Sequence, residues 1–347
     1  MIEILRTEEA WNLALQETKN FDCYHTPEYH KVRLKENEVP FVVYYKQGEH
    51  KILIPFIKRP VFNSEYYDLS SVHGYLGPAS TIDQNTFDVN AFSESFEQLM
   101  KDENIICAFS KLNPYLLHQE LILGRLGELE HVGELVYLDL ETDPIIQRQN
   151  YRKSVKNDVN KLRRNFNVRT ATSAEDIDTF IDIYSETMQR VSADSRFKLG
   201  QDYFYTLSNS KNFHSRLLLV ESKETGEVVA GSVSLITNGI IQGEHMGTKT
   251  AFLPMSPAKL LYDEIRLIGN ELNQKYLNYG GGPGGKEGPL FIMKFGFSKD
   301  LMPVKVWKHI VNQELYEHFS SQVENTNEVI NYFPKYRTAV LKKEVKD

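Results

Sequence analysis

The chain has 347 residues, more than one average domain, and its 41% hydrophobic and 12% aromatic content is enough for folded cores. This composition excludes a disordered or fibrous protein. No stretch approaches the roughly 20 apolar residues that span a bilayer, and the first residues lack the apolar core of a signal peptide.

The two cysteines, Cys23 and Cys107, are too few for a disulfide framework, and this favours a reducing compartment. Neither cysteine lies in a paired motif, so we expect no metal site. We therefore expect a cytoplasmic protein with no transmembrane segment.

The net charge of −7 conceals a strong asymmetry. Residues 148–169 hold eight cations against one acid, a net of +7, which leaves −14 on the rest of the chain. Such a segment suggests a local site for phosphates or another anionic ligand. It is equally compatible with a solvated helix face whose charges pair with acidic neighbours. The eight cations are Arg148, Arg152, Lys153, Lys156, Lys161, Arg163, Arg164 and Arg169.

Two stretches of the chain follow the same plan. Strand-like runs flank a turn at Gly48 in residues 41–57 and a turn at Gly226 in residues 217–237, and each predicts a hairpin. Asn238-Gly239 predicts a further two-residue turn into a strand at 240–246. Each hairpin follows a helix-like stretch and precedes a loop, a helix and a strand. We therefore predict an internal duplication of a mixed α/β unit.

The helices of the second half are predicted from caps and apolar spacing. Ser173 is a favourable N-cap for a helix whose apolar stripe includes Tyr184. Ser256 and Pro257 predict another helix start, with serine as the cap. The apolar stripe of that helix is Leu261, Ile265, Ile268 and Leu272.

The basic segment predicts a helix with an apolar buried face and outward cations. That face is formed by Tyr151, Val155, Val159, Leu162 and Phe166. A strand-like run at 135–140 precedes the segment, so we place a boundary near 142–149. The predicted domains are residues 1–145 and residues 146–347.

The run from Leu277 to Phe297 carries the strongest functional signal. Gly280, Gly281 and Gly282 open a turn whose main chain a ligand can approach closely, and Lys294 then lies among apolar residues. An ammonium near apolar surface is costly unless it is paired or used. The glycines formally match a dinucleotide-binding motif, but they follow a long helix and include Pro283, so we favour a turn beside a substrate cleft or a structural turn.

Other candidate residues are distributed along the chain. Glu244 and His245 lie on a predicted strand, where either can act as a general base, although such pairs are common by chance. Arg190 ends a helix and is either functional or a partner of the helix dipole. Asp68, Ser70 and Tyr75 belong to a run of polar residues, tyrosines and glycines that suits a sugar- or nucleotide-facing loop as well as an ordinary turn.

Several of these stretches, taken in order, resemble the FemAB-like branch of the GNAT acyltransferases. They are Tyr-Asp-Leu-Ser-Ser-x-x-Gly-Tyr-x-Gly-Pro at 67–78, Tyr-Arg-Lys-Ser-Val-Lys at 151–156, Ile-Tyr-x-x-Thr-Met-x-Arg at 183–190, the glycines at 280–282 with Lys-Phe-x-Phe at 294–297, and Trp-Lys-His-Ile-Val-Asn at 307–312. The resemblance implies an α/β (α+β) fold of two tandem GNAT-like domains, each a mixed central sheet flanked by helices. It places the acceptor on the first domain and the acyl donor on the second.

The resemblance also implies a function. Members of this family transfer an acyl or aminoacyl group to an amine of a cell-envelope precursor, either peptidoglycan or polysaccharide. By position, Lys294 resembles the lysine that supports acyl transfer. Arg152 and Lys156 would face an anionic ligand, and Asp68 with Tyr75 would line the acceptor side. We list as catalytic Lys294, Glu244 and His245, and as substrate-binding Asp68, Ser70, Tyr75, Arg152, Lys156, Tyr184, Arg190, Gly280, Gly281 and Gly282.

The identity of the donor is left open by the sequence. GNAT enzymes that use acyl-CoA usually hold its pyrophosphate in a glycine-containing turn, whereas residues 253–258 here contain two prolines and no glycine. This favours aminoacyl-tRNA, although the chain has no long helical arm for tRNA. We expect no tightly bound cofactor. The predicted partner is a nucleotide- or lipid-linked saccharide or peptide precursor, and tRNA and the inner face of the membrane are further candidates.

Two alternatives remain at this stage. The first is an acetyl-CoA-dependent N-acetyltransferase that acts on an amino sugar. The second is a non-catalytic protein that binds an envelope precursor.

Overall fold

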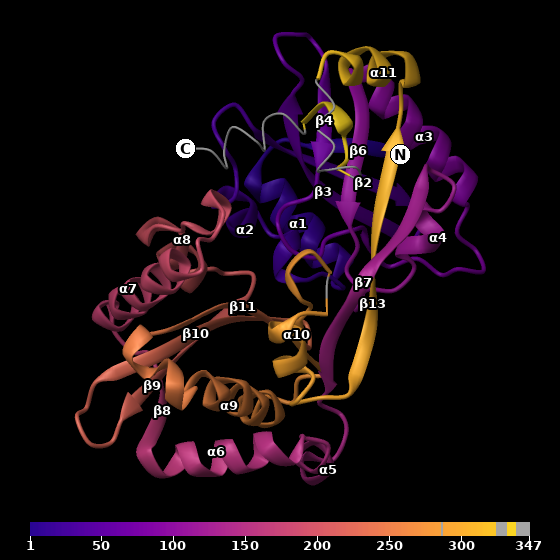
Figure 1. The fold of residues 1–347 in the computed structure, drawn as a ribbon. Coiled ribbons are helices and arrows are strands. Elements are labelled where there is room, and N and C mark those ends of the chain that lie inside the picture. The colour runs from indigo at the N-terminus through magenta and orange to yellow at the C-terminus, as the bar shows by residue number, and fades with distance from the viewer. Residues whose placement is uncertain (286, 324–331, 338–347) are drawn as a thin grey trace. The chain divides into compact units, whose positions relative to one another are not determined.

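The computed structural model describes residues 1–285, 287–323 and 332–337, and they group into two compact units (Figure 1). Unit 1 contains residues 1–132 and 304–347, and unit 2 contains residues 133–303. These units differ from the predicted ranges in two places. Residues 133–145 belong with the second unit, and the chain from residue 304 onward belongs with the first. The predicted acceptor and donor roles of the two parts remain predictions.

Unit 1 is a six-stranded mixed sheet with helices on both faces. Its strand order is β1-β2-β3-β4-β6-β13, and the short β5 pairs with β3. The strands are β1 (Ile2–Leu5), β2 (Val39–Gln47), β3 (His50–Pro60), β4 (Tyr67–Ser70), β5 (Ala79–Ser80), β6 (Ile105–Lys111) and β13 (Asp300–Ile310). The helices are α1 (Glu8–Thr18), α2 (Pro27–Lys31), α3 (Val89–Asp102), α4 (Gln119–Leu123) and α11 (Gln313–Ser321).

Alternation along β2 explains why both faces of this sheet are covered. Phe41, Val43 and Tyr45 belong to one buried cluster, which includes apolar residues of α3. Val42 and Tyr44 belong to another, which includes Trp11 and other residues of α1. Successive side chains of a strand point to opposite faces, so one uninterrupted apolar run serves both layers.

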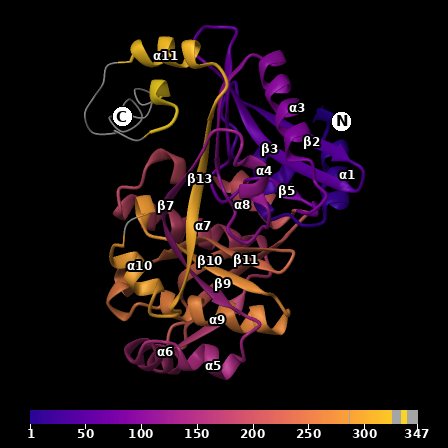
Figure 2. The same cartoon turned by 90° about the vertical axis from the view of Figure 1, so that its right-hand side faces the viewer.

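Unit 2 repeats the same arrangement. Its strand order is β8-β9-β10-β11-β12-β7. The strands are β7 (Glu128–Asp139), β8 (Phe166–Thr170), β9 (His214–Ser222), β10 (Val228–Thr237), β11 (Ile240–Thr248) and β12 (Tyr276–Gly280). The helices are α5 (Pro144–Gln149), α6 (Lys153–Asn165), α7 (Ala174–Arg190), α8 (Gln201–Ser208), α9 (Ala258–Glu271) and α10 (Pro289–Lys294). Helices α7 and α8 lie on one side of the sheet, whereas α9, with α6 outside it, lies on the other (Figures 1 and 2).

The two sheets share one pattern of strand directions. In each unit the first three neighbouring pairs are antiparallel, the fourth is parallel and the fifth is antiparallel. The last strand of each sheet comes from the other part of the sequence. β7 follows the strands of unit 1 along the chain but pairs within unit 2, and β13 follows the strands of unit 2 but pairs within unit 1. The predicted mixed α/β duplication is therefore confirmed, and the exchange of the last strands is an addition that the sequence did not suggest.

Three local features predicted from the sequence are confirmed. Asn238 and Gly239 both have positive φ angles, 47° and 88°, as the predicted two-residue turn between β10 and β11 requires. Ser173 caps α7 as predicted, accepting a hydrogen bond from the Asp176 N–H. The predicted buried face of the basic helix is correct, since all five of its residues are at most 5% exposed.

The prediction for the start of α9 was wrong in detail. Ser256 has a left-handed backbone (φ 55°) and closes a preceding 3-10 turn, whereas an N-cap serine needs an extended backbone. Pro257 therefore occupies the cap position without a side-chain hydrogen bond. Leu272, predicted to face the core, lies after the last turn of α9 and is 40% exposed.

Two further features bear on function. None of the described helices is long and apolar enough to cross a membrane. Within the described residues, no group of three or more histidine, cysteine, aspartate or glutamate side chains is placed to hold a metal ion.

Candidate functional site

The candidate site lies in unit 2, where two parallel strands separate. The pairing of β11 with β12 covers only Ile240–Gln242 and Tyr276–Asn278, although β11 continues to Thr248. In unit 1 the equivalent parallel pair, β4 with β6, is paired along the whole of β4. Among the strands that the structure describes, none therefore pairs with β11 beyond Gln242 on this side, unlike its counterpart in the first unit.

A β-bulge falls at this point. On the other side of β11, His245 pairs with Val233 and Gly243 with Ser234, so Glu244 is the extra residue of a bulge in β11. A bulge bends its strand and redirects the side chains around it. The separation from β12 and the bulge at Glu244 thus occur within two residues of each other.

Two buried amides hold the strands together where their pairing stops. The Asn278 side-chain N–H donates to Gln242 Oε1 at 2.7 Å, and Asn278 Oδ1 accepts the Gly280 N–H at 2.7 Å. Both side chains are almost fully buried. The second hydrogen bond folds the chain sharply at Gly280, whose φ of 84° favours glycine. The expectation of a glycine turn is met here, and Asn278 is a contributor that the sequence reasoning missed.

Lys294 reaches back to this turn from the last residue of α10. Its Nζ donates to the Gly281 carbonyl oxygen at 2.9 Å. A Cβ atom at Gly280 would lie 3.0 Å from the same ammonium, so glycine leaves room for it. Burial lowers the pKa of Lys294 to about 8, and its described surroundings supply no carboxylate partner. The structure therefore brings together Gly280, Gly281 and Lys294, as the sequence predicts.

Glu244 and His245 lie at the bulge but differ in their surroundings. His245 is 7% exposed, and its ring packs edge-on against the rings of Tyr184, Tyr203 and Phe204 at 5.3, 5.3 and 5.6 Å. Its Nε2 lies 2.9 Å from the Tyr203 hydroxyl and 3.9 Å from the Glu244 carboxylate. Tyr184 therefore contributes to an aromatic enclosure of His245, and Tyr203 had no recognisable signal in the sequence.

Arg190 forms hydrogen bonds at the C-terminal end of β11. It donates to the Thr248 carbonyl oxygen and to the Thr250 hydroxyl, both at 3.0 Å, and to the Thr187 hydroxyl at 3.3 Å. These contacts tie the end of α7 to the end of β11. They give Arg190 a structural task next to the site.

Arg152 and Lys156 lie at the start of α6, at the other end of the α10 segment. The Arg152 N–H donates to the Gly296 carbonyl oxygen at 2.8 Å, and Lys156 Nζ donates to the Gln149 carbonyl oxygen at 2.8 Å. The Arg152 main chain thus contacts Gly296, which lies two residues after Lys294 in the sequence. Within the part of the chain that the structure describes, no hydrogen bond or ion pair joins either side chain to the glycine turn.

The predicted residues of unit 1 make different contacts. Asp68 is fully buried, and its carboxylate accepts from Arg59 and Arg337, both at 2.6 Å, and from the Tyr336 hydroxyl at 3.1 Å. These contacts explain Asp68 as the centre of a buried ion-pair cluster, and an acceptor-binding role for it remains only a prediction.

Tyr75 and Ser70 are half-buried. Lys111 Nζ lies 4.2 Å above the Tyr75 ring, and burial lowers the pKa of Lys111 to about 8. The Ser70 hydroxyl donates to the Ser71 carbonyl oxygen at 3.3 Å. Lys111 was not among the predicted residues.

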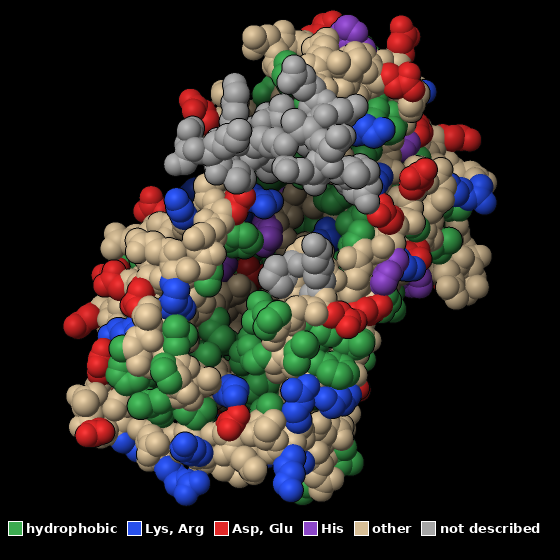
Figure 3. Space-filling model, viewed as in Figure 1, with side chains coloured by type: hydrophobic (Ala, Val, Ile, Leu, Met, Phe, Trp, Pro, Cys, Tyr) green, Lys and Arg blue, Asp and Glu red, His purple; other side chains and the backbone are tan. Residues whose placement is uncertain are grey.

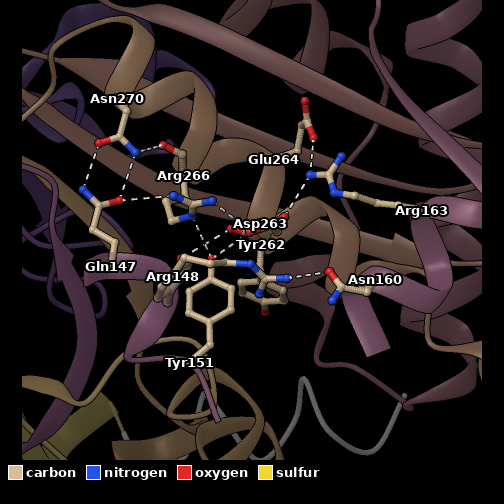
Figure 4. Close-up of polar contacts among 11 residues, drawn as sticks. Gln147, Arg148, Tyr151, Asn160, Arg163, Tyr262, Asp263, Glu264, Arg266 and Asn270 are labelled. Carbon is tan, nitrogen blue, oxygen red and sulfur yellow. Dashed lines mark hydrogen bonds and ion pairs between the residues drawn. The ribbon is translucent and has the colours of Figure 1, made fainter. Parts of the chain in front are cut away.

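A buried polar network lies between α6 and α9 (Figure 4). Asp263 accepts from the Tyr151 hydroxyl at 3.1 Å, from Arg266 at 3.2 Å and from Arg163 at 2.9 Å. Burial alone would raise the pKa of Asp263, but the Arg163 hydrogen bond and the neighbouring arginine charges outweigh it and lower that pKa. Asp263 also keeps Arg266, which is almost fully buried, in its charged form.

The start of α9 is poorly suited to hold phosphates. The Lys259 and Leu260 N–H groups already donate to the Ser256 and Pro257 carbonyl oxygens, at 3.1 and 2.9 Å. Pro257 itself has no N–H. A helix N-terminus binds anions through unpaired N–H groups, and few remain here.

Comparisons with known proteins identify similar sequences and folds. Residues 149–283 match the model of the acetyltransferase (GNAT) domain, a range that includes the bulge and the glycine turn but ends before Lys294. No curated protein matches the chain significantly.

Solved structures share the fold across both units. FemX is 12% identical, with a TM-score of 0.70 over 91% of this chain and 99% of its own. L-PGS from Bacillus licheniformis is 16% identical, with a TM-score of 0.58 over 89% of this chain and 94% of its own. A C-terminal domain assigned to a lysylphosphatidylglycerol synthetase from Agrobacterium fabrum is 11% identical, with a TM-score of 0.58 over 87% and 92%. Residues 149–283 therefore resemble an acetyltransferase (GNAT) domain, within a fold shared with FemX and L-PGS, as the resemblance to the FemAB-like branch predicts.

Proposed function

We propose that this protein forms an amide by moving an aminoacyl or acyl group onto an amine of a nucleotide- or lipid-linked cell-envelope precursor. The observation that carries the proposal is the open end of the β11–β12 pair, where the Lys294 ammonium lies on the Gly281 carbonyl. It belongs to the unit that contains the GNAT domain match. The likeness to FemX and to a domain named for lysylphosphatidylglycerol synthesis supports an envelope acceptor.

In the proposed reaction, the amine nitrogen of the acceptor attacks the carbonyl carbon of the donor. The new C–N bond forms while the ester or thioester bond of the donor breaks, and the leaving oxygen or sulfur takes up one proton. Lys294 donates a hydrogen bond to the oxyanion that develops, a task that typically contributes about 10²–10³-fold to turnover. A lysine with a pKa near 8 is still largely protonated at neutral pH and can perform it.

The amine must lose a proton to become a nucleophile. We assign this step to Glu244, because the bulge separates it from the ladder at the point where β12 diverges. His245, whose Nε2 lies 3.9 Å from that carboxylate in an aromatic enclosure, is the second candidate for the base. Arg152, Lys156 and the unit 1 residues Ser70 and Tyr75 remain candidates for contacts with substrate.

Aminoacyl-tRNA is the favoured donor, because the start of α9 offers few N–H groups for the pyrophosphate of CoA. The second candidate is acyl-CoA, which the GNAT domain match favours. Isothermal calorimetry with acetyl-CoA and with aminoacylated tRNA distinguishes the two. We expect heat only from the charged tRNA, and saturable heat from acetyl-CoA would reverse the assignment.

The function itself is tested with a panel of donors and amine-bearing nucleotide-linked precursors. Mass spectrometry should detect an acceptor heavier by one acyl or aminoacyl group. A protein that binds a precursor but yields no such product with any donor would be a binding protein instead.

A further inference from the structure

The proposed acyl transfer does not account for the many cations of the basic helix α6, only some of which pair with carboxylates. Arg163 of α6 pairs with Asp263 and Glu264, and Arg169 of the adjoining β8 pairs with Asp176 and Glu221. The one acid of the segment, Asp158, pairs with Lys259 of α9. Among the described residues, no carboxylate pairs with the other cations that α6 and its first turn present outward. These are Arg152, Lys153, Lys156, Lys161 and Arg164.

Apolar side chains are exposed beside these cations. Leu290 and Ile292 on α10 are 42% and 50% exposed, and Ile145 and Ile146 on α5 are 68% and 48% exposed. Helix α5 leads directly into α6, with only Asn150–Arg152 between them. Helix α10 has six residues, so Leu290 and Ile292 lie within about 6 Å of its C-terminal residue along the helix axis.

The end of α10 is packed on the start of α6. Gly296 accepts the Arg152 N–H at 2.8 Å, and a Cβ atom at Gly296 would lie 2.8 Å from Val155. Lys299 adds a cation here, with its Nζ 4.2 Å from the centre of the Phe295 ring. Burial, and then the charge of Arg152, lower the pKa of Lys299, which places these two cations near each other. In Figure 3, hydrophobic side chains gather around α10, and Lys and Arg side chains border them on the side of α6.

We infer that this surface of unit 2, formed by α5, the outer face of α6 and α10, docks on an anionic lipid bilayer. Leucine and isoleucine side chains can enter the headgroup boundary while the lysines and arginines around them contact lipid phosphates. Recognition of RNA bases would instead favour exposed aromatic side chains for stacking, and the large exposed apolar residues of this surface are aliphatic.

Charge distribution supports the same orientation. The basic segment carries +7, whereas the rest of the chain carries −14. An anionic membrane attracts the segment and repels the remainder, so the molecule is turned with α6 toward the lipid. The inference does not depend on acyl transfer, because a binding protein with this surface would dock in the same way.

The test measures co-sedimentation of the protein with vesicles of phosphatidylcholine containing 30% phosphatidylglycerol, and with vesicles of phosphatidylcholine alone. We expect binding only to the anionic vesicles, and its loss in 1 M salt. The triple variant Lys153→Glu, Lys161→Glu and Arg164→Glu should bind at least about a hundredfold more weakly, since each basic residue lost near such a surface costs about fivefold and each new glutamate is repelled. Its matched control reverses Lys19, Lys31 and Lys101, which are exposed in unit 1, and should bind within about twofold of the unaltered protein.

The apolar part of the surface is tested separately. Leu290→Ser with Ile292→Ser should weaken vesicle binding several-fold, whereas Leu13→Ser with Leu117→Ser, at exposed positions in unit 1, should not. Unchanged thermal midpoints in all variants would establish that they fold. Turnover of a water-soluble acceptor without vesicles should not differ between the triple variant and the unaltered protein, so a failure of the proposed function would be seen independently.

Three results would overturn the inference. They are no binding of the unaltered protein to anionic vesicles, equal losses in the triple variant and its charge control, and binding of uncharged tRNA that the triple variant abolishes while vesicles remain unbound. The last result would identify the surface as an RNA-binding face.

Discussion

Two lysines in this chain are held near apolar surroundings without a carboxylate partner among the described residues. Lys294 donates only to the Gly281 carbonyl, and Lys111 lies over the Tyr75 ring. Burial lowers the pKa of both to about 8, compared with an ordinary value of 10.5. A charged lysine in this situation destabilises the folded state, and proteins retain such groups mainly where the charge is used.

This arrangement predicts a rise in stability at alkaline pH. Between pH 8 and 10.5 the folded protein has lost the two protons while the unfolded chain still binds them, so the free energy of unfolding rises with pH. Each lysine contributes up to about 3 kcal/mol, less where water reaches it. Urea denaturation at pH 7.5 and pH 10 measures the rise, and Lys294→Met and Lys111→Met should each reduce it. A rise that both variants retain would contradict the assignment.

Among the helices, the contact between α6 and α9 depends on one carboxylate. Asp263 compensates Arg266, and these side chains are 4% and 5% exposed. Asp263→Asn leaves the Arg266 charge uncompensated in a buried place and should cost about 3–5 kcal/mol of unfolding free energy.

The neighbouring Glu264 provides a matched control. It pairs with the same Arg163, but both side chains are partly exposed, so Glu264→Gln should cost less than about 1 kcal/mol. Chemical denaturation of the two variants measures the difference. Equal costs would show that Asp263 does not hold the two helices together.

Features of the helices that depend on residues close in sequence were predictable, whereas contacts between residues far apart in sequence were not. The buried face of α6 was predicted correctly, because helical spacing of Val155, Val159 and Leu162 is a local signal. The partners of Asp263 were not predicted, since Tyr151 and Arg163 lie 112 and 100 residues away in the sequence. The start of α9 was misplaced because Ser256 closes the preceding turn with a left-handed backbone, which residue type alone does not reveal.

For the whole molecule, the duplication was predictable and the exchange of strands was not. Repeated hairpins and turns reveal two similar units, but nothing in β13 indicates that it pairs with β6, about 200 residues earlier. Trp307 of β13 is fully buried in unit 1 and packs against Phe56 and Phe96. The candidate site was likewise predictable only where its parts are close in sequence, as Gly280, Gly281 and Lys294 are.

Because β13 pairs within unit 1, a substitution in β13 should destabilise strands that lie far from it in the sequence. Trp307→Ala should cost about 3–5 kcal/mol, because it leaves a large cavity in the core of unit 1. Hydrogen exchange should then accelerate in β3 and β6 of that unit. Acceleration confined to residues 300–310 would contradict the pairing of β13 with unit 1.

Turnover of the Lys294→Met variant is the measurement closest to the central claim, that acyl transfer takes place at the open end of β11 and β12. With any donor and acceptor pair that the unaltered protein joins, we predict a loss of about 100-fold or more in kcat and a thermal midpoint that does not fall. Lys275→Met, an exposed lysine just before β12, should leave kcat unchanged. If Lys294→Met turned over as fast as the unaltered protein, the reaction would have to take place elsewhere.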